Sequence, residues 1–141
     1  MKLHQDVTAA GTYVALRPTP GTWAMLMQWA TQVGLTLEPD LHVTVLYSRK
    51  VIPVEPSTDE HHAIPMAFAP LGDSALVVHL AAPSIVRRHE QLIAQGGTHD
   101  YDDFLVHMTL VGKTSKLLPK HLPMFDFGLI FGEEYTEELH P

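Results

Sequence analysis

The alternation of apolar and polar residues along the chain predicts a structure that contains more strand than helix. Six runs have the length, spacing and β-branched content of strands: residues 11–17, 41–48, 63–72, 74–82, 104–112 and 124–131. The Gly72-Asp73 pair separates the third run from the fourth, which predicts a β-hairpin. The last run leads into an acidic tail, GEEYTEELHP.

Two other segments carry apolar residues at helical spacing. The first begins at Thr22, which can cap a helix, and ends at Gly34; its inner positions are Trp23, Leu26, Met27, Ala30 and Val33. The second opens with Pro83 and Ser84 and ends at Gly96-Gly97; its inner positions are Ile85, Val86, His89, Leu92 and Ile93. Strands mixed with two helices favour an α+β fold, in which an antiparallel sheet packs helices on one face.

Length and composition indicate a single domain over residues 1–141. Hydrophobic residues make up 45% and charged residues 18%, which disfavours both a disordered and a membrane-spanning chain. No apolar segment near the start resembles a signal peptide, so we expect a cytoplasmic protein that binds no membrane. The absence of cysteine excludes disulfides, thiolate metal sites and cysteine nucleophiles. The net charge of −7 disfavours long nucleic acid as a partner, so any phosphate ligand should be small or locally held.

Two predicted strands share one pattern, in which apolar residues alternate with a histidine and a threonine. The segments are LHVTVL (41–46) and VHMTLV (106–111), and they indicate an internal duplication. Because residues two apart in a strand point to the same face, His42 and Thr44 should emerge together, and so should His107 and Thr109. If a pseudo-two-fold axis relates the two halves, these pairs face one another across a groove.

Two imidazoles and two hydroxyls at one place have the chemistry for phosphodiester cleavage. One neutral histidine can accept a proton from the attacking hydroxyl, and one protonated histidine can give a proton to the leaving oxygen. The threonines can donate hydrogen bonds to the phosphate oxygens, and the reaction needs no metal. The alternative is that both pairs belong to a polar outer face without catalytic function.

The paired His-x-Thr strands in a small chain without cysteine resemble those of the 2H phosphoesterases. Within that superfamily the chain is similar to the phage anti-CBASS cyclic-oligonucleotide nucleases, and the similarity covers nearly all of it: GTYVAL, LHVTVLYSRK, LVVHLAAPSIVRRHEQL, HDYDDFLVHMTL and FGEEYTEEL. The resemblance implies a two-lobed antiparallel sheet with outer helices and a concave groove. It also implies metal-independent hydrolysis of the 3′–5′ bonds of cyclic di- and trinucleotides, the messengers of CBASS defence, in the cytoplasm of the host cell.

The resemblance also assigns roles to individual residues. His42 and His107 are expected to be the general acid and base, with Thr44 and Thr109 as phosphate ligands. Tyr13 corresponds to an aromatic residue that stacks on a base of the ligand. A carboxylate near the C-terminus should contact the ligand, and the choice lies between Glu134 and Glu137. No cofactor and no metal ion are expected.

Several features allow a second interpretation. The run Asp59-Glu60-His61-His62 could bind a metal ion, but adjacent side chains in a proline-containing loop rarely converge, which favours a solvated loop. His79 and His89 have the setting of structural histidines. Arg49 and Lys50 follow the first motif strand and suit either a ligand contact or a solvated loop.

Two other functions are compatible with the same sequence. One is a 2H enzyme that opens 2′,3′-cyclic phosphates on RNA, which the negative charge and the scarcity of arginine disfavour. The other is a sponge that binds the messenger without cutting it, which would not need an acid and base pair. The base preference, the ring size and the oligomeric state stay open.

Overall fold

The fold is an antiparallel sheet with two helices, as the sequence pattern predicts. The computed structural model describes residues 9–71, 75–101, 103–112 and 121–140. In this part of the chain the strands are β1 (Gly11–Pro18), β2 (Val43–Ser48), β3 (His61–Leu71), β4 (Ala75–Ala81), β5 (His107–Val111) and β6 (Leu129–Leu139). The helices are α2 (Pro20–Val33) and α3 (Pro83–Ala94). The α+β class is therefore confirmed, and so is the β3–β4 hairpin, although its predicted turn at Gly72-Asp73 lies outside the described residues.

The strand order brings the two His-x-Thr strands side by side. The order is β1-β2-β5-β4-β3-β6, and β6 pairs again with β1, so the sheet closes on itself. Pairing is extensive within the groups β2-β1-β6 and β5-β4-β3, whereas β2 and β5 join the groups through the single pair Val43↔Met108. In each group the chain leaves the middle strand, passes through a helix and enters the strand that carries the His-x-Thr motif. The two units are β1-α2-β2 and β4-α3-β5.

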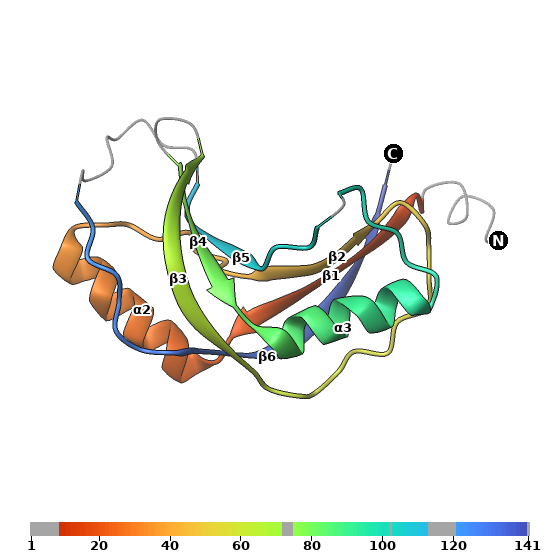
Figure 1. The fold of residues 1–141 in the computed structure, drawn as a ribbon, viewed down its shortest axis with the longest axis horizontal. Helices are drawn as coiled ribbons and strands as arrows, with labels where there is room; N and C mark the ends of the chain where they lie inside the picture. The colour runs from red at the N-terminus through yellow and green to blue at the C-terminus, as the bar shows by residue number, and fades with distance from the viewer. Residues whose placement is uncertain (1–8, 72–74, 102, 113–120, 141) are drawn as a thin grey trace.

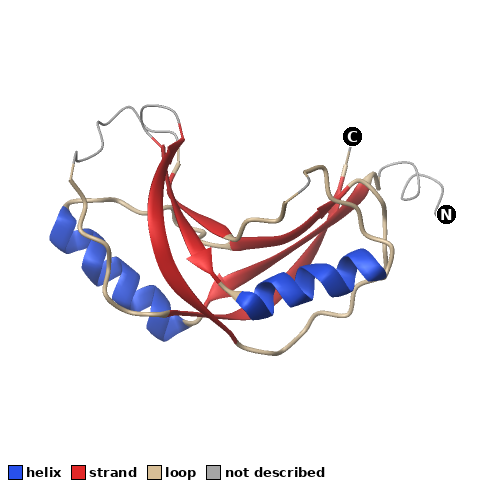
Figure 2. Cartoon of the chain, in the orientation of Figure 1, coloured by secondary structure: helices blue, strands red, loops and turns tan. Residues whose placement is uncertain are grey.

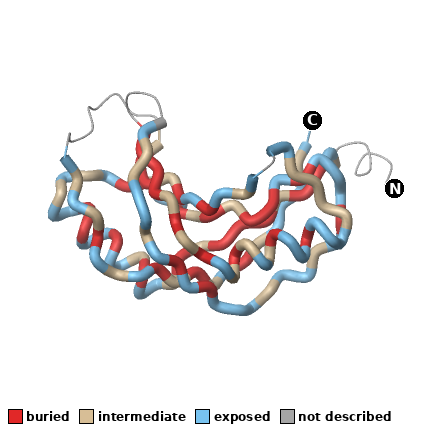
Figure 3. The backbone as a smooth tube through the Cα atoms, viewed as in Figure 1, coloured by how far each residue is buried: buried red, intermediate tan, exposed pale blue. Residues whose placement is uncertain are grey.

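Both helices lie on the same side of the curved sheet (Figures 1 and 2). Helix α2 packs against β1 and β6, and α3 packs against β2 and β3. Buried residues gather along the strands and on the helix sides that face them (Figure 3). No helix in the described part of the chain is long and apolar enough to cross a membrane.

Helix α2 begins one turn earlier than predicted. Its N-cap is Thr19 and not Thr22, because Pro20 has the backbone angle of a first helical residue and lacks the N–H that a helix start leaves unpaired. The Thr19 hydroxyl accepts a hydrogen bond from the Thr22 N–H at 3.4 Å. At the other end Gly34 stops the helix in the left-handed conformation, with φ of 78°, as predicted.

The inner face of α2 is confirmed for Leu26 and Ala30, which are buried, and for Trp23 and Val33, which pack on the core, but Met27 and Trp29 differ from the prediction. Trp29 is buried, with 7% of its surface exposed, whereas the predicted inner residue Met27 is 40% exposed. The indole N–H of Trp29 donates to the Pro123 carbonyl at 3.1 Å, and its ring packs on Phe125 with centroids 5.0 Å apart. The segment before β6 therefore supplies the partner that turns Trp29 inward.

The last strand lies further along the chain than predicted. The sequence pattern placed it at residues 124–131, but β6 runs from Leu129 to Leu139 and includes most of the acidic tail. The apolar residues before it cover α2, as Phe125 shows, and do not extend the sheet. The acidic residues adopt a strand because β1 pairs with them from Gly11↔Leu139 to Pro18↔Phe131, and one face of an antiparallel sheet can remain solvated.

His89 on α3 connects the helix, the sheet and the loop before β5. It is buried, and its Nδ1–H donates to the Val45 carbonyl at 2.7 Å. Its ring stacks on Phe104, with centroids 3.9 Å apart and planes inclined by 4°, while His99 packs against it edge-on at 4.8 Å. Burial, above all, lowers the pKa of His89; the Val45 hydrogen bond opposes this effect and the neighbouring His99 adds to it.

The lowered pKa of His89 makes stability depend on pH in a defined direction. Below about pH 6.5 the unfolded chain protonates this histidine while the folded protein still holds it neutral, so stability present above that pH is lost as the pH falls toward the folded pKa. We predict that the urea midpoint falls less between pH 7.5 and 5.5 in His89→Asn than in the wild type, because asparagine can keep the donor to Val45 but cannot titrate. His61, whose pKa burial also lowers, acts in the same direction in both proteins. Equal losses in the two proteins would contradict the prediction.

Candidate functional site

The two His-x-Thr pairs lie next to each other on the face of the sheet opposite the helices. Val43 and Met108 pair directly and are both fully buried. Because antiparallel strands run in opposite directions, this register sets His42 beside Thr109 and Thr44 beside His107. Cβ atoms directly opposite in such a pair are about 5 Å apart and diagonal ones about 7 Å, so the four side chains are within reach of one small group.

The two histidines are held in the same way. The Nδ1 of His42 lies 2.9 Å from the Asp40 carbonyl oxygen, and the Nδ1 of His107 lies 3.0 Å from the Leu105 carbonyl oxygen. Each partner is the carbonyl two residues earlier. Because a carbonyl oxygen only accepts, both Nδ1 atoms carry the proton of the hydrogen bond. The nitrogen that can accept or release a proton is therefore Nε2 in both rings.

Tyr13 on β1 contacts the first pair. Its hydroxyl lies 3.0 Å from the Thr44 hydroxyl, and its ring packs edge-on to that of His42 with centroids 6.3 Å apart. Burial raises the pKa of Tyr13, although the Thr44 hydrogen bond opposes this, so the phenol remains protonated near neutral pH. The Tyr13 hydroxyl can then donate to Thr44 and leave the threonine proton for another acceptor.

The structure separates the two candidate acids near the C-terminus. Glu137 pairs with Tyr13 across β1 and β6 and is exposed on the face of the site. Glu134 is buried elsewhere: its carboxylate accepts two hydrogen bonds from Arg88, both of 2.9 Å, and one of 2.8 Å from the Ser57 N–H. Glu134 therefore joins β6 to α3 and the loop before β3, and Glu137 is the acid that lies beside Tyr13.

A cleft of about 600 Å³ extends from the second pair. Its walls include Thr44 and His107 from the two motifs, Val77 and His79 from β4, and Leu105 from the loop before β5. His79 pairs directly with His107, and their ring centroids are 6.2 Å apart. A third imidazole thus lies beside the motif histidine of β5, although the sequence had favoured a structural role for it.

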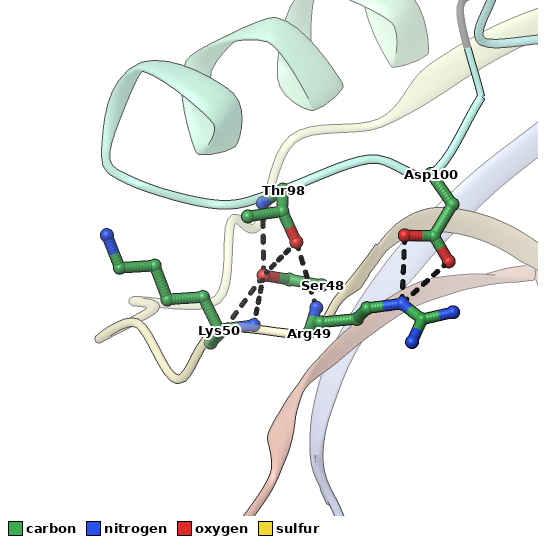
Figure 4. A network of polar contacts seen from close by, with 5 residues as sticks. All are labelled: Ser48, Arg49, Lys50, Thr98 and Asp100. Carbon is green, nitrogen blue, oxygen red and sulfur yellow. Dashed lines mark hydrogen bonds and ion pairs between the residues drawn. The ribbon is translucent and has the colours of Figure 1, made fainter.

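The loop that forms one wall of this cleft is attached to the end of β2 (Figure 4). The buried Ser48 hydroxyl accepts a hydrogen bond from the Thr98 N–H at 3.0 Å, and the Thr98 hydroxyl accepts one from the Arg49 N–H at 2.9 Å. The Arg49 guanidinium also forms an ion pair with Asp100 at 3.0 Å. Arg49 therefore has a third role that the sequence analysis did not consider, a contact with the loop before β5, and its part in ligand binding stays a prediction.

Comparison with known proteins identifies the family of this chain. The sequence model described as Anti-CBASS protein Acb1 matches residues 10–141. The Anti-CBASS protein Acb1 of Vibrio phage KVP40 is 38% identical over 118 residues, which cover 78% of each chain. The chain belongs to the anti-CBASS protein Acb1 family.

Other Acb1 proteins align over larger or smaller shares of their length. The one from Acinetobacter phage Ac42 is 32% identical over 139 residues, which cover 92% of this chain and 91% of the relative. The one from Sphingomonas paeninsulae is 28% identical over 132 residues, or 82% of this chain and 21% of that longer protein. The resemblance to phage anti-CBASS proteins is therefore confirmed, and all predicted site residues lie within the part that the Acb1 family model matches.

Two residues that the sequence analysis did not select, Tyr135 and Arg17, lie close to Tyr13 in this Acb1 family member. Tyr135 on β6 lies on the same face as Tyr13, with ring centroids 6.4 Å apart, and the Arg17 guanidinium lies 3.9 Å above its ring. Burial, chiefly, raises the pKa of Tyr135 to about 12. The two-residue spacing of Glu133, Tyr135 and Glu137 is the sequence signal for this arrangement, but the acidic composition of the segment favours a tail over a strand.

The acidic and histidine-rich run at residues 59–62 does not form a cluster. His61 and His62 begin β3, so they point to opposite faces of the sheet. His61 is buried with its Nδ1 2.8 Å from the Ser84 hydroxyl, whereas His62 is exposed. Within the described ranges, no three histidine, aspartate or glutamate side chains are grouped as metal ligands.

The different positions of the two acids predict different effects of substitution. Glu134→Ala should lower the free energy of unfolding by about 3–5 kcal/mol, because it leaves the mostly buried Arg88 charge without its partner. Glu137→Ala should change it by less than about 0.5 kcal/mol, because this residue is on the surface. Urea unfolding of the two variants measures both values. A similar loss in both, or none in either, would show that the two residues are wrongly distinguished.

Proposed function

We propose that this Acb1 family member is a metal-independent phosphodiesterase of the 2H type. Its substrates are cyclic di- and trinucleotides, in which it hydrolyses 3′–5′ bonds, and by doing so it lets a phage evade CBASS defence in the host cytoplasm. The observation that carries the proposal is the matched setting of His42 and His107, which both use Nδ1 to bind the carbonyl two residues earlier. The target is supported by the name of the family, which describes proteins that counteract CBASS.

The order of the elements supports the 2H assignment. Each motif strand is reached from the middle strand of its group through a helix, as β1-α2-β2 and as β4-α3-β5. A pseudo-two-fold axis between β2 and β5 would superimpose the unit β1-α2-β2 on the unit β4-α3-β5. It would also superimpose the His-x-Thr pair of β2 on the pair of β5. Two equivalent pairs suit a reaction in which one imidazole accepts a proton while the other donates one.

The reaction begins with the ribose 2′-OH next to the scissile phosphate. One neutral histidine accepts its proton through Nε2, and the oxygen attacks phosphorus to form a 2′,3′-cyclic phosphate. The bond from phosphorus to the O5′ of the next nucleotide breaks, and the other, protonated histidine gives that oxygen its proton. The attacking hydroxyl is already held within reach, which removes the entropic cost of bringing in a separate nucleophile. Water then hydrolyses the cyclic phosphate with the two histidines in exchanged roles.

Thr44 and Thr109 bind the non-bridging oxygens on which negative charge increases. A donor fixed in position before the reaction stabilises that charge more in the transition state than in the ground state. Tyr13 supports this role because its neutral hydroxyl can orient Thr44 at 3.0 Å. The ring of Tyr13 stacks on one base of the ligand, and Glu137, the acid beside it, contacts the same nucleotide.

Removal of either motif imidazole should abolish most of the activity without unfolding the protein. We predict that His42→Ala and His107→Ala lower turnover about 10²- to 10⁴-fold, because each loses a general acid or base. Turnover is measured with a panel of cyclic di- and trinucleotides in EDTA, with products resolved by chromatography and mass spectrometry. His62→Ala, an exposed histidine outside the site, is the matched control.

Each outcome of this assay has a clear meaning. If the wild type binds the cyclic nucleotides but forms no product, it is a sponge. If it leaves them intact but opens the 2′,3′-cyclic phosphate of an RNA oligonucleotide assayed in parallel, it is the RNA enzyme. Activity that EDTA abolishes and a divalent metal restores would contradict the metal-independent mechanism. Wild-type rates in either motif variant would contradict the assigned histidines.

The proposed nucleophile predicts how the substrate can be changed. A cyclic dinucleotide with a 2′-deoxyribose at the scissile position should be cut at least about 10³-fold more slowly than the ribose form, because no neighbouring hydroxyl can attack. A 2′,3′-cyclic phosphate should accumulate early with the ribose form, which quenched-flow mass spectrometry can detect. Equal cleavage rates for the ribose and the 2′-deoxyribose cyclic dinucleotides would show that water attacks the phosphate directly.

A further inference from the structure

The cleft beyond His107 extends past the two His-x-Thr pairs. It has a volume of about 600 Å³, within the range of small-molecule sites, and it shares Thr44 and His107 with the proposed catalytic centre. Tyr13 and Glu137 lie on the other side of that centre, on β1 and β6, and do not line it. A ligand bound at His42 and His107 would therefore have the cleft on one side and the residues of β1 and β6 on the other.

The lining of the cleft suits a nucleobase. Its lining includes small apolar residues from β2, β4 and β3: Val45, Val77 and Ala69. Tyr47 and Leu105 stand at its rim with 52% and 64% of their surfaces exposed. A planar, largely apolar group can cover this surface and stack on the Tyr47 ring, as bases do on aromatic residues in many nucleotide-binding sites.

His79 is a polar residue in this cleft to which the proposed mechanism gives no role. It is partly exposed, and no hydrogen bond joins its ring to any residue that the structure describes. His99, also in the lining, is already bound through Nε2 to the Asp103 carbonyl at 3.1 Å. His79 can therefore donate a hydrogen bond to a ligand without breaking one within the protein.

The register of the sheet gives His79 a counterpart in the other group of strands. His79 lies directly across from His107, and the pair Leu16↔Val43 sets Arg17 beside His42 in the same way. Each motif histidine thus has a basic side chain on the adjacent middle strand. Arg17, however, is engaged by Tyr135 and by ion pairs with Asp40 and Glu133, so His79 is the more available of the two.

We infer that this cleft is the subsite for the nucleotide of the ring that is not cut, with its base against Tyr47 and Leu105 and its phosphate bound by His79. The inference rests on the proposed function, because it takes a cyclic dinucleotide as the ligand and the His-x-Thr pairs as the place of cleavage. A ring of two nucleotides has one phosphate at the catalytic centre and one beside it. His79, next to His107, is placed to bind the second phosphate.

Binding measurements test the subsite without relying on turnover. The ligand is a 2′-deoxy cyclic dinucleotide, and the reference is a half-ligand, a 2′-deoxynucleoside 3′-methyl phosphate, with affinities from calorimetry. Leu105→Trp fills the cleft from its exposed rim, and His79→Asn removes the imidazole. Each substitution should weaken binding of the cyclic dinucleotide at least about tenfold and reduce the ratio of its affinity to that of the half-ligand. A tenfold loss corresponds to about one stacked base or one hydrogen bond to a phosphate.

The controls separate this inference from the proposed function. His62→Asn, an exposed histidine on β3, should bind the ring like the wild type, and thermal unfolding checks that every variant is folded. Ring binding unchanged in both cleft variants overturns the subsite, and a loss confined to Leu105→Trp overturns the role of His79. If the wild type does not bind the ring, both proposals fail. If the cleft variants lose binding but the wild type never hydrolyses a ribose ring, the subsite stands and the catalytic proposal fails.

Discussion

The pairing of β2 with β5 through Val43 and Met108 is the contact on which the arrangement of the site depends. Both side chains are completely buried, so the hydrophobic core holds the two strands in this register. A shift by one residue would exchange the two faces and turn a histidine and a threonine into the core. Burying such polar groups without partners costs roughly 1–3 kcal/mol each, so the register that stabilises the core also brings the motifs together.

The surrounding polar contacts hold the elements on either side of this pairing. On one side, the ion pair of Glu134 with Arg88 joins β6 to α3, with the guanidinium nearly buried and the carboxylate fully so. On the other side, Ser48 and Thr98 join the end of β2 to the loop that forms the cleft wall. Both groups are satisfied by several hydrogen bonds, which is the condition under which buried polar groups stabilise one conformation. The result is a site whose two sides are attached to the same sheet.

The elements with strong local patterns were predicted well, and the others were not. The strand character of β1, β2 and β5, both helices and the hairpin follow from spacing within each segment. The prediction was wrong for β6, because its acidic half becomes a strand only through pairing with β1. On the inner face of α2 it held for Leu26 and Ala30 but was wrong for Met27, and it missed Trp29, which contacts Phe125, a residue distant in sequence. Local periodicity carries no information about either partner.

The sequence by itself determined which side chains each motif carries and which of them share a face. The two-residue period of a strand puts His42 with Thr44, and His107 with Thr109, whatever the rest of the fold does. Only the tertiary structure decided that the pairs meet, that Glu137 and not Glu134 lies beside Tyr13, and that His79 lies across from His107. These relations depend on the register between strands, which the packing of the whole core sets and which no single segment encodes.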